Sequence, residues 1–217
     1  MFGHQLVISP EEERNIVISN QSGKSNILSR LERYGIKIDA KDIKVQKILD
    51  TVKDREFSGY SYDGADASFE LLANRLLGKV PEYLKVESYS VNVSKSENII
   101  TKANVTFLID NKKIECSGEG NGPVNALDNA IRSNFKKVEK YYNYFSDLKL
   151  LDYKVRILNT GTEATTRVLI ESTDKSGISW FTVGVSPNII EASFKALIDS
   201  LDYKLYKEKA PANLNEK

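Results

Sequence analysis

The sequence has little of what most catalytic and metal sites require. Among its 217 residues there is one cysteine, Cys116, and one histidine, His4. An internal disulfide and a zinc site built from several thiolates are therefore excluded, and such cysteine usage is typical of a reducing cytosol. No His-Glu-x-x-His motif, phosphate loop or Gly-x-Ser-x-Gly motif occurs. Nothing nominates a catalytic residue or a metal ligand, so the residues alone indicate a binding or assembly module.

An excess of charge of one sign is missing as well. Lys and Arg number 31 against 30 Asp and Glu, which leaves a net charge of +1. This balance favours neither nucleic acid nor an anionic membrane as a partner. The start of the chain lacks the pattern of a signal peptide, and the apolar runs are too short to span a membrane. We therefore expect a cytoplasmic protein with no membrane partner and no nucleic-acid partner.

The first part of the chain has helical periodicity. Its clearest apolar stripe, at positions i, i+3, i+4 and i+7 of one helix face, consists of Val45, Ile48, Leu49 and Val52. A shorter helix over roughly 26–34 is expected to end at Gly35, and another is expected to end at Gly78. The sequence predicts helical linker subdomains over residues 1–80.

After Pro81 the apolar period changes to two, which is typical of strands, and one order of segments occurs twice. Three strands, a glycine turn and a helix occupy residues 81–145 and recur over residues 146–209. Ala126 aligns with Ala192 at an offset of 66, and Val105 aligns with Val168 at an offset of 63.

One sheet with one helix cannot bury both of its faces alone, so the two copies should pack together. We predict an α+β fold, with a small helical linker subdomain followed by two pseudo-twofold-related βββα units packed together. A regulatory domain would then span residues 81–209, and residues 210–217 would form a disordered tail. The internal symmetry also suggests a homodimer.

The turn Gly118-Glu-Gly-Asn-Gly-Pro123 is the most informative segment. Glycine allows backbone to approach a ligand closely, and proline in the first helical turn loses no hydrogen bond. The apolar face of the helix that follows consists of Val124, Leu127, Ile131, Phe135 and Val138. Free N–H groups at the start of this helix would suit a small carboxylate. A tight turn without any ligand is the alternative.

Two classes of function then compete. A small-molecule sensor would hold the carboxylate of an amino acid at the glycine turn and its apolar side chain beside it. A double-stranded RNA-binding domain has a similar order of elements, but it needs lysines at the start of the helix. Those positions hold Pro123, Val124 and Asn125, and in the second copy Asn188, Ile189 and Ile190. The neutral residues favour the sensor, and a module that serves assembly alone is a third alternative.

Several long motifs resemble the C-terminal part of the isopropylmalate/citramalate/homocitrate synthase family. Residues 118–126, 161–172 and 183–193 are similar to its regulatory domain, and residues 22–27 and 59–72 are similar to the linker subdomains of its citramalate synthase-like branch. The resemblance covers almost all of residues 5–206 and is closest to citramalate synthase.

The resemblance implies an acyltransferase that condenses acetyl-CoA with pyruvate to citramalate, in isoleucine biosynthesis. In this family a divalent metal polarises the keto acid inside a (β/α)8 barrel. The barrel is absent from this chain, so we expect no catalysis and no cofactor in the chain alone. The chain would be the allosteric part of a homodimer, would work with a barrel in cis or in trans, and would bind isoleucine as a feedback inhibitor. An isopropylmalate synthase-type domain that senses leucine is the alternative within the family.

The resemblance also implies which residues bind the regulatory ligand. Carried over from the matching motifs, they are Asn121, Gly122, Val124, Leu150, Tyr153, Ile157, Ala164 and Ile189. Asn121 and Gly122 would face the polar end of the ligand, and a helix cap is the competing role of Asn121. The apolar members have core packing as their competing role. In the linker, the residues that would approach an active site are Gly23, Lys24, Asn26, Tyr60 and Tyr62.

Overall fold

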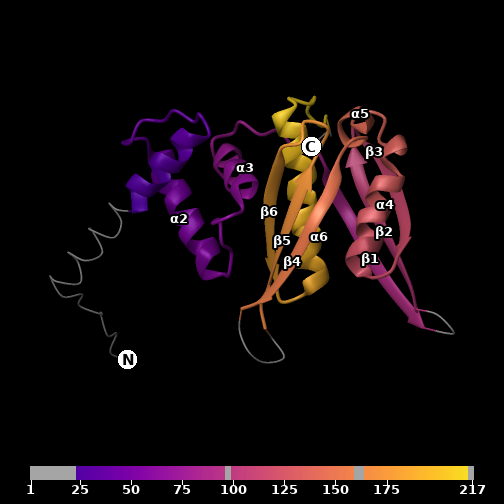
Figure 1. Cartoon of the computed structure of the whole chain (residues 1–217). Coiled ribbons are helices and arrows are strands. Elements are labelled where there is room, and N and C mark those ends of the chain that lie inside the picture. Colours follow the sequence, from indigo (N-terminus) through magenta and orange to yellow (C-terminus); the bar gives the residue numbers. More distant parts are fainter. Residues whose placement is uncertain (1–22, 96–98, 159–163, 215–217) are drawn as a thin grey trace, which may run out of the picture. The chain divides into compact units, whose positions relative to one another are not determined.

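The computed structural model describes residues 23–95, 99–158 and 164–214 of the chain (Figure 1). His4 lies outside these residues. Internal contacts divide the chain into two compact units, Met1–Asp54 and Arg55–Lys217. The boundary near residue 80 between linker and regulatory domain stays a prediction.

The helices in the first part of the chain follow the predicted periodicity. One helix runs through residues 23–33 of the described chain, and Gly35 follows it with a φ of 69°, a left-handed conformation that favours glycine. The buried face of α2 (Ile43–Phe57) consists of Val45, Ile48, Leu49 and Val52. The predicted apolar stripe is confirmed. α3 (Asp66–Leu76) belongs to the second unit, and Gly78 follows it with a φ of 72°.

Two three-stranded antiparallel sheets follow, and each carries one long helix. The first sheet consists of β1 (Lys85–Lys95), β2 (Ile99–Ile109) and β3 (Lys112–Gly120), and α4 (Pro123–Ser133) packs on it (Figure 1). The second consists of β4 (Lys149–Ile157), β5 (Thr166–Thr173) and β6 (Ser179–Ser186), with α6 (Ile189–Lys207). A 3-10 turn, η1 (Phe135–Lys137), and the short α5 (Tyr142–Phe145) lie between them. The predicted α+β fold with two similar βββα units is confirmed.

The two copies correspond at one offset in their third strands and helices. A Cβ on Gly118 would meet the backbone nitrogen of Ala130 in α4, and a Cβ on Gly184 would meet that of Ala196 in α6, so these glycines and helices match at an offset of 66. Gly118 pairs with Ala103 in the first sheet, and Gly184 pairs with Val168 in the second. Val168 therefore matches Ala103. The predicted alignment of Val105 with Val168 is wrong by two residues. A shift of two residues leaves the same side chains on the same face of the strand, so the alternation of apolar residues does not detect it.

The glycines at the end of β3 allow the helix to approach the sheet closely. A Cβ on Gly118 would overlap the backbone of Ala130, and a Cβ on Gly120 would lie 2.5 Å from the backbone nitrogen of Ala126. A Cβ on Gly184 would overlap the backbone of α6 in the same way. The sequence suggested that a ligand approaches the backbone closely here. At these three glycines, the segment that does so is a helix.

The first long helix ends earlier than predicted. α4 stops at Ser133, where the side-chain amide of Asn134 donates hydrogen bonds to the carbonyls of Ala130 and Ser117, each at 2.8 Å. Asparagine competes in this way with the helical backbone. Phe135 and Val138 nevertheless remain buried, so they still contribute to the core.

The two copies share one core. Tyr89 of β1 stacks on Phe194 of α6 with 4.2 Å between ring centroids, and the buried side chains of both sheets and both helices form one cluster. Packing of the units against each other follows from the single apolar face of each sheet.

The segment after α6 differs from the predicted disordered tail. Within residues 210–214, Asn213 binds the backbone of the first copy at three points. Its amide nitrogen donates to the Leu108 carbonyl (2.9 Å), its backbone N–H donates to the Glu82 carbonyl (2.8 Å), and its side-chain oxygen accepts from the Asp110 N–H (2.8 Å). Hydrogen bonds to the segment before β1 and to the end of β2 therefore hold this segment on the first sheet.

Candidate functional site

The first glycine turn leads from β3 into α4 without a side-chain cap. Gly122 is the N-cap residue, its backbone is extended (φ −169°, ψ 172°), and a Cβ there would meet nothing within 4 Å. Asn121 is exposed, and its backbone N–H donates to the side-chain oxygen of Asn125 at 3.1 Å. Val124 is half-buried and packs against the core. The N-cap position considered for Asn121 is therefore held by Gly122, which has no side chain to fill it.

The second turn, from β6 into α6, is capped. The side-chain oxygen of Asn188 accepts hydrogen bonds from the N–H groups of Ile190 (2.8 Å) and Glu191 (3.3 Å). The hydroxyl of Ser186 accepts from the N–H of Asn188 at 3.1 Å. At the offset of 66, Ser186 corresponds to Gly120 and Asn188 corresponds to Gly122. The first turn lacks both of these polar side chains.

Two of the predicted ligand residues, Tyr153 and Ile189, are linked through Ser193 of α6. The hydroxyl of Tyr153 on β4 lies 2.8 Å from the hydroxyl of Ser193, which donates to the carbonyl of Ile189 at 2.6 Å. Tyr153 and Leu150 also pack against the core. Core packing, the competing role of these apolar residues, therefore applies to Leu150 and Tyr153 within a single chain.

The other predicted residues are more open. The side chain of Ile157 is 68% exposed and that of Ile189 is 45% exposed. Ala164 is half-buried just before β5. No hydrogen bond between described residues joins the Asn121 turn to β4. Three of the predicted residues thus lie at the start of α4, and the others lie on β4, before β5 and at the start of α6.

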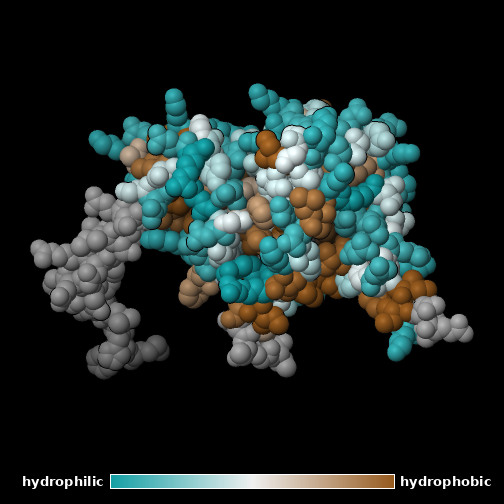
Figure 2. Space-filling model, in the orientation of Figure 1, coloured by the Kyte–Doolittle hydropathy of each residue, from teal (hydrophilic) through white to brown (hydrophobic). Residues whose placement is uncertain are grey.

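Apolar side chains gather at the lower ends of β4 and of the β1–β2 hairpin (Figure 2). The exposed large apolar side chains on these strands are Tyr89, Val93, Ile99, Ile100, Leu151, Val155 and Ile157. Apolar surface gathered in this way is typical of a protein contact.

Sequence reasoning missed Thr101. This residue lies on β2 opposite Gly120, it is 1% exposed, and its hydroxyl has no hydrogen-bond partner among the described residues. A buried hydroxyl without a partner is costly and calls for an explanation. Thr101 lies in the buried phase of β2, but no sequence pattern reveals that a partner is missing.

A charged cluster joins α3 to α6. The guanidinium of Arg75 donates to Asp199 (2.7 Å) and to Asp202 (2.6 Å), and the hydroxyl of Ser68 donates to Asp199 at 3.0 Å. Burial raises the pKa of Asp202 to about 7, against the opposing effect of Arg75 and with a further rise from Asp199. One guanidinium thus faces two carboxyl groups, which leaves an excess of negative charge where water is scarce.

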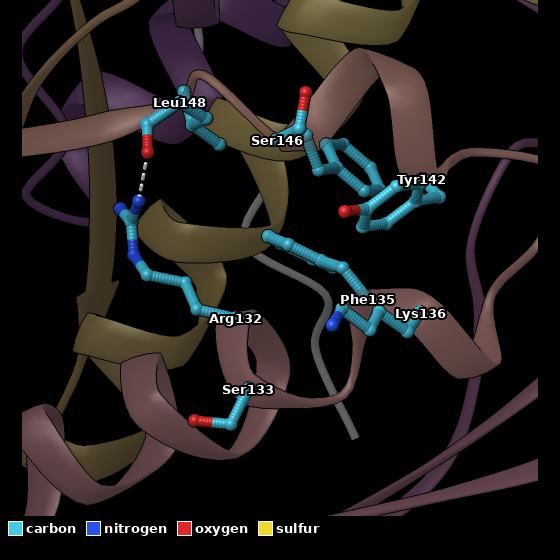
Figure 3. A pocket seen from close by; sticks show the side chains of 8 residues that line it. Arg132, Ser133, Phe135, Lys136, Tyr142, Ser146 and Leu148 are labelled. Atoms are coloured by element: carbon cyan, nitrogen blue, oxygen red, sulfur yellow. Dashed lines mark hydrogen bonds between the residues drawn. The ribbon is translucent and has the colours of Figure 1, made fainter.

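A cavity of about 370 Å³ opens beside α4 and α5 (Figure 3). Its lining includes Arg132, Lys136 and Tyr142, but none of the predicted ligand residues. The guanidinium of Arg132 donates to both carboxylate oxygens of Asp128 at 2.7 Å and to the carbonyl of Leu148, as the dashed line in Figure 3 marks. This cation is therefore already paired, and Lys136 is the other cation in the lining.

The predicted linker residues lie in different environments. Gly23, Lys24 and Asn26 lie on the helix over 23–33. Tyr62 is fully buried, and burial raises its pKa to about 12. Tyr60 stacks beside Tyr62 with 6.2 Å between ring centroids. A role for Tyr62 at an active site would require its loop to move.

The described part of the chain was also searched for membrane-spanning helices and for groups of metal ligands. Every helix in that part falls short of the length or apolarity needed to cross a membrane. Within residues 23–95, 99–158 and 164–214, no three His, Cys, Asp or Glu side chains are grouped so that they could hold a metal ion. The divalent metal that the resemblance implies therefore finds no fitting donor set among these residues.

Comparison with known proteins supports the predicted resemblance. The model of the LeuA allosteric (dimerisation) domain matches residues 63–205. The (R)-citramalate synthase of Geobacter sulfurreducens is 45% identical over 197 residues, which are 88% of this chain and 37% of that protein. The (R)-citramalate synthase of Aquifex aeolicus is 42% identical over 209 residues, which are 93% of this chain and 39% of that protein. The 2-isopropylmalate synthase of Aquifex aeolicus is 28% identical over 202 residues, which are 90% of this chain and 36% of that protein.

The chain thus spans less than two fifths of the length of these relatives. The matched domain includes α3 and both βββα units, and therefore both turns described above. The chain belongs to the family of the LeuA allosteric (dimerisation) domain, and it corresponds to the regulatory region of the citramalate and isopropylmalate synthases.

Proposed function

We propose that this chain is the allosteric and dimerisation part of a citramalate synthase-like acyltransferase, and that it binds isoleucine as a feedback inhibitor. The observation that carries the proposal is the identity of 45% with a citramalate synthase across 88% of the chain, combined with the match to an allosteric domain. The condensation of acetyl-CoA with pyruvate, its divalent metal and its (β/α)8 barrel would lie outside this chain, in cis or in trans. The assembly would act in the cytoplasm.

Two features of the structure support an amino acid as the effector. The start of α4 offers backbone N–H groups that no N-cap side chain fills, which suits a carboxylate. The aliphatic side chains of Ile157 and Ile189 remain exposed and would enclose the apolar part of the ligand.

Exposed apolar side chains also support a homodimer. Seven large apolar side chains are exposed on β1, β2 and β4, and a second copy of the chain would cover them. A ligand bound beside such an interface would favour one arrangement of the dimer. A difference in affinity worth about 1–3 kcal/mol between two arrangements would change the activity of an attached barrel by about 5- to 150-fold.

The test is isothermal titration of the chain with L-isoleucine, with L-leucine and L-valine as competitors. We expect saturable binding of isoleucine. The variant Ile157→Glu should abolish it, because a carboxylate would enter the apolar part of the site. Ile178→Glu is the matched control, since Ile178 is 71% exposed against 68% for Ile157 but lies outside the predicted site. The absence of heat with all three amino acids would leave assembly as the only role and would overturn the sensor.

A leucine sensor is the second candidate. It is favoured by the identity of 28% with a 2-isopropylmalate synthase over 90% of the chain. Tighter binding of leucine than of isoleucine in the same titration would select it. Isoleucine and leucine differ only in where one methyl group branches, so selectivity depends on the shape of the pocket.

A further inference from the structure

Asn121 and Gly122 form the only asparagine–glycine pair in the sequence. In such a pair the backbone nitrogen of the glycine can attack the side-chain amide carbon of the asparagine, because glycine has no side chain to obstruct the approach. A folded chain prevents this attack where it holds either group in place. Whether the pair reacts therefore depends on the contacts of the two residues in the structure.

The structure leaves both reacting groups of this pair unrestrained. Asn121 is exposed, and Gly122 lies between β3 and α4 as the N-cap residue. Among the described residues, no hydrogen bond involves the side-chain amide of Asn121 or the backbone N–H of Gly122. A Cβ at Gly122 would meet nothing within 4 Å, so there is room around this residue for the backbone to rotate. Ring closure between the two residues therefore breaks no hydrogen bond of either reacting group.

The neighbouring asparagines of α4 provide an internal comparison. Asn125 is followed by Ala126, whose backbone N–H donates to the Gly122 carbonyl at 2.9 Å. The side-chain amide of Asn129 donates to the Glu119 carbonyl at 2.8 Å. In each case a hydrogen bond restrains one of the two groups that would have to meet, and neither asparagine precedes a glycine.

We propose that Asn121 is a site of spontaneous deamidation. The Gly122 nitrogen loses its proton and bonds to the side-chain carbonyl carbon of Asn121, and the Cγ–Nδ2 bond breaks so that ammonia leaves with that proton. The product is a cyclic succinimide. Water then opens this ring, which leaves aspartate where the new bond breaks and isoaspartate where the original backbone bond breaks. One water is consumed and one ammonia is released, and the reaction is independent of any effector.

The two products should affect the start of α4 in opposite directions. Aspartate adds a negative charge near the positive end of a helix whose first turn contains no acidic residue, which is favourable. Isoaspartate inserts a methylene group into the backbone between β3 and α4. The Cβ position of Gly120 lies 2.5 Å from the Ala126 nitrogen, so the strand end has little room to absorb such an insertion. Conversion to isoaspartate should therefore loosen the packing of α4 on the sheet.

The experiment ages the chain in warm, mildly alkaline buffer, which favours loss of the proton from the attacking nitrogen, and follows the reaction by mass spectrometry. Trypsin releases Asn121, Asn125 and Asn129 together in the peptide 114–132, so fragment ions compare all three in one molecule. We expect position 121 to gain the mass that separates an amide from a carboxyl group, while positions 125 and 129 stay unchanged.

Gly122→Ala is the matched variant, and it should fold normally because its Cβ position is open. The added methyl group hinders the attack, and a barrier higher by about 1.4 kcal/mol would slow the reaction about tenfold. An equal rate in this variant would remove the glycine from the mechanism and overturn the proposal.

The excised peptide 114–132 is the control for the effect of the fold, and a sample digested before ageing corrects for damage during handling. If position 121 stays unchanged in the folded chain while the peptide reacts, the fold protects Asn121 and the proposal is wrong. Equal rates at positions 121 and 125 of the folded chain would show that the contacts of α4 do not select the site.

The melting temperature tests the consequence for α4. Asn121→Asp should melt at or above the temperature of the wild type, because it carries the charge without the inserted methylene group. An aged sample rich in isoaspartate, as measured with an isoaspartyl methyltransferase, should melt below the fresh protein. An aged sample with an unchanged melting temperature would refute the loosening of α4.

Discussion

The stability of the protein should fall as the pH rises towards neutrality, because of Asp202. This carboxyl group lies in the polar contact between α3 and α6, where it faces Arg75 of α3, Asp199 of its own helix, and Glu82 and Tyr83 of the segment before β1. Its second carboxylate oxygen is buried without a hydrogen-bond partner among the described residues. Burial raises its pKa to about 7, and Arg75 offsets only part of this rise.

The sign and the size follow from proton linkage. The folded chain holds the Asp202 proton up to about pH 7, whereas the unfolded chain releases it near pH 3.9. Between these values the folded state binds more protons, so each pH unit of increase lowers the free energy of unfolding by up to about 1.4 kcal/mol. From pH 5.5 to 7 the loss should be about 2 kcal/mol, and above the folded pKa it should level off.

Carboxylates with a lowered pKa do not obscure this range. Hydrogen bonds with Lys140 and Lys195 lower the pKa values of Asp110 and Glu191, respectively. Such groups stabilise the fold above their unfolded pKa, and that contribution is lost only in more acidic solution. Between pH 5.5 and 7 they are ionised in both states, so their effect is constant.

The assay is urea denaturation of the wild type and of Asp202→Asn at several values between pH 5.5 and 8. The variant should show a nearly flat free energy of unfolding, because its amide does not titrate. Asp152→Asn is the control, since Asp152 is a well-exposed carboxylate paired with Lys154, and it should keep the wild-type slope. Parallel pH profiles for the wild type and Asp202→Asn would refute the reasoning.

Three other changes test the packing and the proposed interface. Gly118→Ala should destabilise the chain by about 1–3 kcal/mol in urea denaturation, because its Cβ would overlap backbone of Ala130, whereas Gly122→Ala should change stability by less than about 0.5 kcal/mol; equal effects would contradict the packing role. Lys204→Met should lower the melting temperature and reduce the free energy of unfolding by about 3 kcal/mol, because the Lys204 side chain is 2% exposed and its ammonium pairs with three carboxylates. An unchanged melting temperature would show that these ion pairs do not stabilise the fold. Ile157→Glu should shift the proposed dimer towards monomer in light scattering, and a mass equal to that of the wild type would remove β4 from the interface.

Periodicity predicted the secondary structure well because it depends on which side chains are buried. The stripe of α2 and the alternation of β2 and β5 both reflect a single buried face. The glycine turn was harder, because glycine indicates that backbone is approached closely but does not identify what approaches it. For Gly118 and Gly120 the answer is α4 itself, and only Gly122 has open space where a side chain would be.

The polar features depended on partners far apart in the sequence. Arg75 meets Asp199 across 124 residues, and Asn213 meets Leu108 across 105. Local patterns carry no information on such pairs, so neither the raised pKa of Asp202 nor the binding of the final segment could be predicted. The family resemblance placed the candidate ligand residues on the correct domain, but it did not reveal the difference between the two helix starts.

The hydrogen bonds of Asn213 affect the order in which the protein is completed during synthesis. Leu108 and Asp110 emerge from the ribosome about a hundred residues before Asn213, whose hydrogen bonds they share with Glu82. The backbone groups at the turn between β2 and β3 therefore remain hydrated until α6 has been synthesised. Only then can Asn213 reach the first sheet and bind them. A nascent chain halted after Lys209 would carry every strand and helix that the structure describes, and it would still lack the hydrogen bonds of Asn213.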